Sequence, residues 1–214
     1  MGRNLDEKTS DESLRRLIDT IVADDGELFS ELLRGSSTLA TASFAEGATR
    51  QGANASACFI EEIGHQIYSG DTALHFAAAA YRQKMAEKLI KAGANVRAKN
   101  RRGSEPLHSV AVGSPGSPRW DPVAQAATIG CLIEAGADPN AQNMDGATPL
   151  HRAVRTRCAG AVQALLDHGA DPAIRNKNGS TAMQLALHTT GRGGSGSSEA
   201  KAQQEEILRL LQGR

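Results

Sequence analysis

Hydrophobic residues in the segment 146–178 fall on one side of each of two short predicted helices. Three-and-four spacing of apolar residues is typical of an amphipathic helix. The apolar positions are Leu150, Ala153 and Val154 in the first helix and Val162, Leu165 and Leu166 in the second. Two helices this short bury only one side each, and isolated helices below about 12 to 15 residues are marginal in water. The pattern therefore predicts a unit that must stack on neighbours.

Polar and special residues set the ends of these two helices. The hydroxyl of Thr148 can cap the first helix, and the fixed φ of Pro149 suits a first helical position. Gly169 follows the second helix, at a point where the chain usually needs a positive φ. The segment is thus predicted as a turn, a helix, a second helix and a glycine stop.

Further copies of the unit begin at Gly70, Gly103 and Gly179. Gly70 and Gly103 are 33 residues apart, and so are Gly146 and Gly179. The copy at Gly103 carries ten extra residues, 114–123, and the copy at Gly179 carries twelve, 190–201. Both insertions are predicted to lie between the two helices of their repeat.

The sequence TPLH at Thr148–His151, the following Ala153, the 33-residue period and the Gly-Ala-Asp after the second helix resemble ankyrin repeats. The resemblance covers roughly residues 70–213. It is weaker at Gly103, where Glu105 replaces the capping Thr, and weakest at Gly179, where Gln184 stands at the His position. It implies an all-α ankyrin-repeat solenoid of stacked helix-turn-helix units joined by β-turn or hairpin loops.

The predicted organisation divides the whole chain into repeats and caps. It comprises a disordered lead-in at 1–12, a divergent amino-terminal capping repeat with a long insertion at 13–69, ankyrin repeats at 70–102, 103–145 and 146–178, and a carboxy-terminal capping repeat with a Gly/Ser-rich insertion at 179–214. Solenoids need such caps for solubility.

The amino-terminal cap rests on two apolar stripes separated by Asp24, Asp25 and Gly26. The stripes are Leu14, Leu17, Ile18, Ile21 and Val22, followed by Leu28, Phe29, Leu32 and Leu33. Residues 35–58 fit either a long loop or a weak helix. The spacing of Ile60, Ile63, Ile67 and Tyr68 predicts a helical turn or two before the repeat at Gly70.

The net charge of zero hides an asymmetry, because residues 1–69 carry a net charge of −6 and residues 70–214 carry +6. Aromatic residues make up 3% of the chain, so Leu, Ile, Val and Ala must form its core. The three cysteines are an odd number without paired spacing, and no apolar run resembles a signal peptide or a membrane span. We therefore expect a cytoplasmic protein that acts as a monomer, without contact to a membrane.

No motif for catalysis or for a cofactor occurs in the sequence. Glu62 and His65 have the Glu-x-x-His spacing of di-iron sites, but such sites need a second copy. His75, His108 and His151 recur at one repeat position, and the ankyrin resemblance implies a structural role there. The glycines and serines of 191–198 favour a tether for a last helix that folds back. We expect no enzyme activity, no cofactor and no metal.

In ankyrin proteins the partner usually meets the turn tips and the exposed side of the first helices. On this chain these positions include Tyr68, Asp71, Ala79, Ala80, Arg101, Arg102, Met144, Asp145, Arg155 and Lys177, as the resemblance implies. The four basic residues would form one concave strip, with Arg152 and Arg157 nearby in the sequence. Trp120, on the inserted loop, is placed at an end of the strip, where it either contacts a partner or packs its own loop.

The sequence favours a non-enzymatic module that binds a protein partner, with an acidic segment as the complement to the strip. Nucleic acid or another polyanion is the alternative ligand for the same arginines. The chain lacks stacking aromatic residues near the strip and is neutral overall, so strong salt-dependent binding to nucleic acid is not expected.

Overall fold

The computed structural model describes residues 5–48, 58–188 and 198–213. The helices and strands of these residues are α1 (Leu5–Ala23), α2 (Gly26–Gly35), the 3-10 helix η1 (Ser37–Ala40), β1 (Phe59–Ile60), β2 (His65–Gln66), α3 (Ala73–Ala79), α4 (Gln83–Lys91), α5 (Pro106–Val110), α6 (Pro122–Glu134), α7 (Pro149–Arg155), α8 (Ala159–Asp167), α9 (Ala182–His188) and α10 (Ser198–Gln212).

The unit at 146–178 forms as its sequence predicts. Thr148 is the N-cap of α7, where its hydroxyl accepts a hydrogen bond from the His151 N–H, and Pro149 occupies the first helical position. Helix α8 ends at Asp167, and Gly169 adopts a φ of +86°. Because each end is fixed by a local signal, the two helices begin and end where the residue pattern places them.

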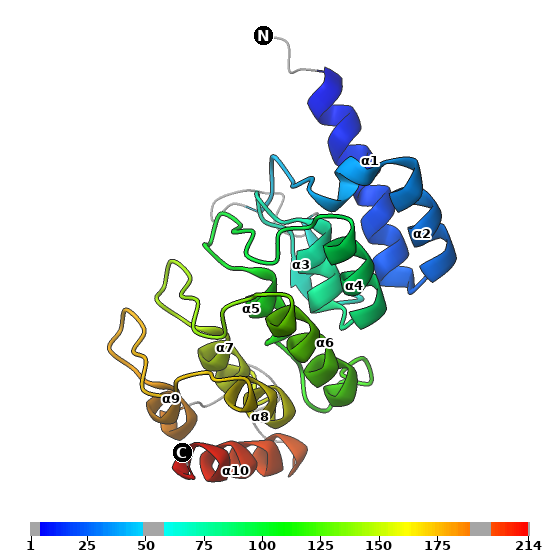
Figure 1. The fold of residues 1–214 in the computed structure, drawn as a ribbon. Helices are drawn as coiled ribbons and strands as arrows, with labels where there is room; N and C mark the ends of the chain where they lie inside the picture. The colour runs from blue at the N-terminus through cyan, green and yellow to red at the C-terminus, as the bar shows by residue number, and fades with distance from the viewer. Residues whose placement is uncertain (1–4, 49–57, 189–197, 214) are drawn as a thin grey trace.

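Helix pairs stack in two layers (Figure 1). Helices α3, α5, α7 and α9 follow one another in one layer, and α4, α6, α8 and α10 in the other. Side chains that are fully buried between the layers include Leu74, Leu89, Leu107, Ile129, Leu132, Leu150, Val162 and Leu165. Each unit buries its apolar side against the next, so the described repeats share one continuous core.

The recurrent histidines link each unit to its neighbour, as the ankyrin resemblance implies. In each, Nδ1 accepts the backbone N–H of the helix N-cap residue of its own unit. The other ring nitrogen lies against a backbone carbonyl of the next unit. These pairs are His75 Nε2 with Ser104 O at 3.1 Å, His108 Nε2 with Ala147 O at 3.1 Å and His151 Nε2 with Ser180 O at 3.0 Å. Since a carbonyl only accepts, Nε2 donates its proton in each pair.

The amino-terminal segment packs α1 against α3, where Leu14, Leu17 and Ile21 are fully buried. Helix α1 begins at Leu5, so the disordered lead-in predicted for 1–12 is wrong over residues 5–12. This stretch contains neither Gly nor Pro to stop the helix. The helix therefore starts earlier than the apolar stripe indicates, although the first buried side chain among residues 11–23 is Leu14, within that stripe.

The two readings left open for 35–58 are resolved only in part. Residues 37–40 form η1, Ser43 makes an isolated antiparallel bridge with Thr72, and residues 49–57 lie outside the described part of the chain. The helical turns predicted after Cys58 are wrong, because β1 and β2 form an antiparallel hairpin there. Gly64 has a φ of +61° in the hairpin loop, a conformation that a helix cannot contain.

Both predicted insertions separate the helices of their repeat, and each also contributes residues to a helix. Asp121 caps α6 by accepting the N–H groups of Val123 and Ala124 at 2.9 Å, so the end of the insertion 114–123 extends this helix. Helix α10 begins at Ser198 and packs on α8 and α9. The predicted tether falls mainly on residues 189–197, which lie outside the described residues.

Candidate functional site: the fingertip cluster

The turns that precede α5, α7 and α9 form a row of fingertips on one side of the stack (Figure 1). Their backbones are hydrogen-bonded in register from one tip to the next. The bonds run from Arg101 N–H to Ser69 O at 2.7 Å, from Met144 N–H to Arg102 O at 2.9 Å and from Lys177 N–H to Asp145 O at 3.0 Å. Main-chain bonds therefore fix the spacing between side chains on successive tips.

An asparagine supports each tip, buried at Asn100 and Asn143 and half-buried at Asn176, and none of the three is among the residues predicted above. Asn143 Oδ1 accepts the N–H groups of Asp145 at 2.9 Å and Ala147 at 3.0 Å. Asn100 and Asn176 do the same for their own turns. The signal that could have found them is an Asn three residues before each of three repeat-starting glycines.

Gly146 is required by the close approach of two tips. Its φ is +69°, and a Cβ built there would lie 2.8 Å from the backbone nitrogen of Lys177. Either feature alone disfavours a larger residue. The glycine that opens the best-formed unit therefore also allows the next tip to lie against it.

Positive charge gathers on the tips and on the adjoining side of α7. Arg102 pairs with Asp145 through Nη2 and Oδ2 at 2.9 Å. Burial lowers the pKa of Arg152, and the charges of Arg155 and Arg102 lower it further, so these three guanidinium groups lie close enough to repel one another. Arg152, which the sequence noted only as a neighbour of the strip, thus interacts with two of its arginines, Arg155 and Arg102.

Two exposed cations of this group have no partner within the described residues. Arg155 and Lys177 are exposed, and their side chains take part in no hydrogen bond or ion pair of that part of the structure. Met144 lies beside them on the tip with 61% of its surface exposed. We refer to Arg102, Met144, Asp145, Arg152, Arg155 and Lys177 as the fingertip cluster.

Tyr68 and Arg101 adjoin the cluster at its amino-terminal end. The phenol of Tyr68 is near enough to Arg152 to act on its pKa. The guanidinium of Arg101 donates to the backbone carbonyl of Ala48, so this side chain is turned toward the segment before the repeats. Arg101 is therefore engaged within the chain, unlike Arg155.

Asp71, predicted among the partner-contacting residues, is fully buried, and its placement on the binding surface is wrong. Its carboxylate accepts the N–H of Tyr68 at 2.7 Å and the Nδ2–H of Asn100 at 2.8 Å. Burial raises the pKa of Asp71, but the hydrogen bond from His65 and the charges of His75 and His65 bring it below its usual value. Asp71 thus stabilises the turn before α3 and links it to Asn100 in the next turn.

Ala79 and Ala80, predicted on the exposed side of the first helix, are buried instead, with 7% and 8% exposure. Arg157 is also buried, at the turn between α7 and α8, with a φ of +58°. None of these residues is part of the fingertip cluster. The exposed side of the first repeat is therefore narrower than the family pattern implies.

Trp120 lies at the opposite end of α5 from the tips, not at an end of the basic strip as the sequence predicts. Its ring is half-buried against the core, and its Nε1–H donates to Gln125 Oε1 at 2.9 Å. A Cβ built on Gly113 would lie 2.8 Å from that nitrogen. Trp120 therefore packs its own loop, although part of the ring stays accessible.

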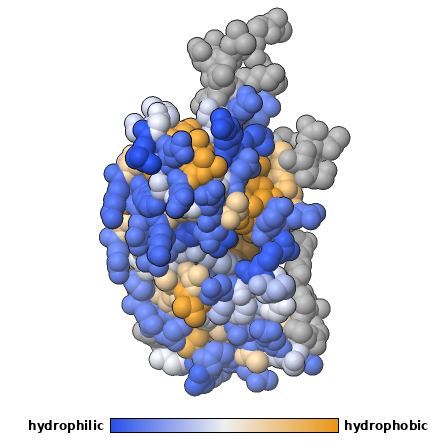
Figure 2. All heavy atoms as spheres, turned by 90° about the vertical axis from the view of Figure 1, so that its right-hand side faces the viewer, coloured by the Kyte–Doolittle hydropathy of each residue, from blue (hydrophilic) through white to orange (hydrophobic). Residues whose placement is uncertain are grey.

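The face of the molecule that carries α2 and α4 differs from the basic fingertip cluster. Figure 2 shows the side on which α2 and α4 lie as mostly hydrophilic, with hydrophobic groups in separate patches.

Among residues 5–48, 58–188 and 198–213, no three His, Cys, Asp or Glu side chains are placed to hold a metal ion. No helix of those ranges is long and apolar enough to cross a bilayer.

Comparison with known families matches two parts of the chain. A model described as "Ankyrin repeat" matches residues 69–101, and one described as "Ankyrin repeats (many copies)" matches residues 132–186. No curated protein matches the chain. The unmatched stretch between them, 102–131, contains the insertion at 114–123. This chain therefore contains ankyrin repeats, whose paired helices stack in two layers.

Proposed function

We propose that this chain is a non-enzymatic binding module that holds an acidic segment of a partner protein across the fingertip cluster. Ankyrin repeats are generally protein–protein interaction modules, and neither family match contains an enzyme domain. Solenoids present extended surfaces of this kind because each repeat adds one tip and one first helix to the same face.

The observation that carries the proposal is the unbalanced positive charge of the cluster. Within it Asp145 offsets one of four cations, Arg102, and Arg155 and Lys177 point into solvent without a partner in the described residues. Burial is the main cause of the lowered pKa of Arg152, and carboxylates of a partner would relieve the further decrease that comes from the charges of Arg155 and Arg102. Arg is also a residue type that often carries interface energy.

The proposed setting is the cytoplasm, with the monomer as the binding form. Cys58, Cys131 and Cys158 are all free thiols, which is typical of a reducing compartment. Burial raises the pKa of Cys158 to about 11, so this thiol is protonated at neutral pH and is a poor nucleophile.

The test is affinity capture from the native host with a charge-reversed variant. Arg155→Glu combined with Lys177→Glu should lose most of the partners that the parent chain recovers, because both side chains are exposed and neither supports the fold. Lys84→Glu combined with Lys91→Glu makes the same change of charge on exposed positions of α4 and serves as the control. Equal recovery by parent and fingertip variant would refute the proposal.

A polyanion is the competing ligand for the same cations. An electrophoretic shift of nucleic acid at low salt that disappears with the fingertip variant would favour that alternative, and it would be expected to weaken steeply as salt is added. If the ligand is instead an acidic protein segment, the parent chain should produce no shift of nucleic acid.

A further inference from the structure

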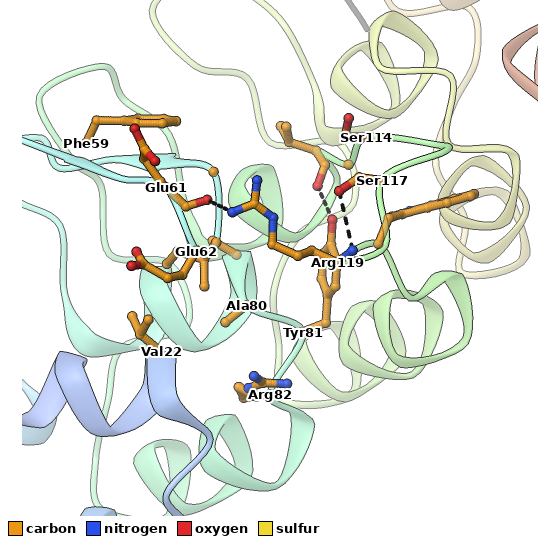
Figure 3. A pocket seen from close by; sticks show the side chains of 16 residues that line it. Val22, Phe59, Glu61, Glu62, Ala80, Tyr81, Arg82, Ser114, Ser117 and Arg119 are labelled. Carbon is orange, nitrogen blue, oxygen red and sulfur yellow. Dashed lines mark hydrogen bonds between the residues drawn. The ribbon is translucent and has the colours of Figure 1, made fainter. Parts of the chain in front are cut away.

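Two segments that interrupt the repeat pattern, the β1–β2 hairpin and the inserted loop 114–120, approach each other. They meet at the ends of α3 and α5 that lie away from the fingertips. The guanidinium of Arg119 closes the gap by donating to the Glu61 carbonyl, as Figure 3 shows. A cavity of about 570 Å³ lies between the hairpin, the loop and the helix ends.

About half of the cavity wall is apolar. It includes Phe59, which is 44% exposed, together with Ile63, Tyr81 and the accessible part of Trp120. The Tyr81 hydroxyl donates to Val112 O at 2.6 Å, so its ring is held in place against the wall. The volume lies within the usual range of ligand pockets, about 300 to 1,000 Å³.

Both arginines that line the cavity have partners, whereas the carboxylates of its two glutamates have none among the described residues. Arg82 pairs with Asp24 at 3.2 Å and donates to Ile21 O at 3.3 Å, and Arg119 is held by the hairpin carbonyl. The carboxylates of Glu61 and Glu62 take part in no hydrogen bond or ion pair among the residues that the structure describes. Figure 3 shows the Glu62 side chain beside Val22 and Ala80, which also line the cavity.

We propose that this cavity binds a lysine or arginine side chain of the partner protein. The aliphatic stem would lie on the apolar and aromatic wall, and the cationic head would meet the Glu62 carboxylate with Glu61 nearby. A neutral aliphatic side chain would leave both carboxylates unpaired, and an acidic one would be repelled.

The inference rests on the proposed function because it assigns the occupant to the same partner. A partner that suits both sites carries acidic residues over the tips and a basic residue over the cavity. The chain has the matching polarity, with a net charge of −6 in residues 1–69 and +6 in residues 70–214.

Trp120 makes the cavity directly measurable, since it is the single tryptophan of the chain and lies in the cavity wall. The experiment titrates the full chain with Nα-acetyl-lysinamide, Nα-acetyl-norleucinamide and Nα-acetyl-glutamic acid amide. Trp120 emission and the backbone NMR shifts of residues 59–64 are followed together. We expect saturable millimolar binding of the lysine probe, at least about threefold tighter than that of norleucine, and no saturation with glutamate.

Substitutions test whether the carboxylates of Glu61 and Glu62 bind the charged end of the lysine probe. Glu61→Gln combined with Glu62→Gln should weaken the lysine probe by about three- to tenfold and leave the norleucine probe unchanged. Glu27→Gln combined with Glu31→Gln makes the same charge change on exposed positions of α2 and should leave both probes unchanged. Arg155→Glu combined with Lys177→Glu should also retain the lysine response, which separates this inference from the fingertip proposal.

The inference is overturned if norleucine binds as tightly as lysine, or if the glutamate probe binds equally well. It is also overturned if the lysine probe changes neither the emission nor the NMR shifts. Because the three probes are compared on the parent chain, this result does not depend on how the variants fold.

Discussion

Buried histidines should make the stack sensitive to mild acid, and His108 allows the effect to be measured. Its side chain is fully buried, and burial lowers its pKa to about 4, with a further decrease from the charge of Arg152. In the unfolded chain the pKa returns to about 6.5. The unfolded state therefore takes up a proton at a pH where the folded state does not.

The sign and size of the effect follow from these two values. A depressed folded-state pKa contributes stability that is present above pH 6.5 and is lost as the pH falls toward 4. Between pH 7 and pH 5, the free energy of unfolding should decrease by about 2 kcal/mol from His108 alone. His75 and His151 also have lowered pKa values because they are buried, so they act in the same direction.

His108→Gln isolates this contribution. Gln184 stands at the same position in the last repeat, where its Oε1 accepts the Thr181 N–H at 2.9 Å, so glutamine can replace the capping acceptor without titrating. Urea unfolding of parent and variant is followed at pH 7 and pH 5 by circular dichroism. Trp120 emission reports on the repeat that contains His108. Both probes are needed because repeat arrays can unfold in steps.

The variant is expected to be less stable than the parent at pH 7, since it loses the bond to Ala147 O. Its decrease from pH 7 to pH 5 should nevertheless be smaller than that of the parent by about 2 kcal/mol. His188→Gln, at an exposed position at the end of α9, is the control. Decreases that agree within about 0.5 kcal/mol for parent and His108→Gln would refute the reasoning.

Two substitutions test the repeat register by chemical denaturation. Leu165→Ala should lower the free energy of unfolding by about 2 to 5 kcal/mol, because Leu165 is fully buried in α8, whereas Leu187→Ala, at a 62% exposed position, should change it by less than about 0.5 kcal/mol. Gly169→Ala should cost about 1 to 2 kcal/mol because the φ there is +86°, although a Cβ would meet no atom within 4 Å. Gly35→Ala, which also has open space but no positive φ, should be neutral or slightly stabilising. A neutral result for both Leu165→Ala and Gly169→Ala would contradict the register.

Features that depend on neighbouring residues were predictable from the sequence. Thr148, Pro149 and Gly169 act within one or two turns of the helices that they cap or stop, so their effect can be inferred from a short window. The alignment of the tips could be inferred for a related reason. Once the period is known, equivalent positions of successive repeats must lie side by side.

Features that depend on distant partners were not predictable in this way. Asp71 has the appearance of a tip residue, but its carboxylate bonds to Asn100, 29 positions further along the chain. The spacing of Ile60, Ile63 and Ile67 fits a helix as well as a hairpin, and period alone does not separate the two in a short apolar run. Arg119 of the inserted loop 114–120 bonds to the β1–β2 hairpin, and the repeat pattern gives no relation between these two segments.

The backbone register of the fingertips has a consequence for redesign. Main-chain bonds and the asparagines beneath them set the spacing of the tips, so the side chains at 102, 144, 145 and 177 can be exchanged without altering the support on which they stand. A different arrangement of charges at these four positions would present a new pattern at the same intervals. The stack could thus be directed to another partner by surface substitution alone, while its core and its histidine links stay as they are.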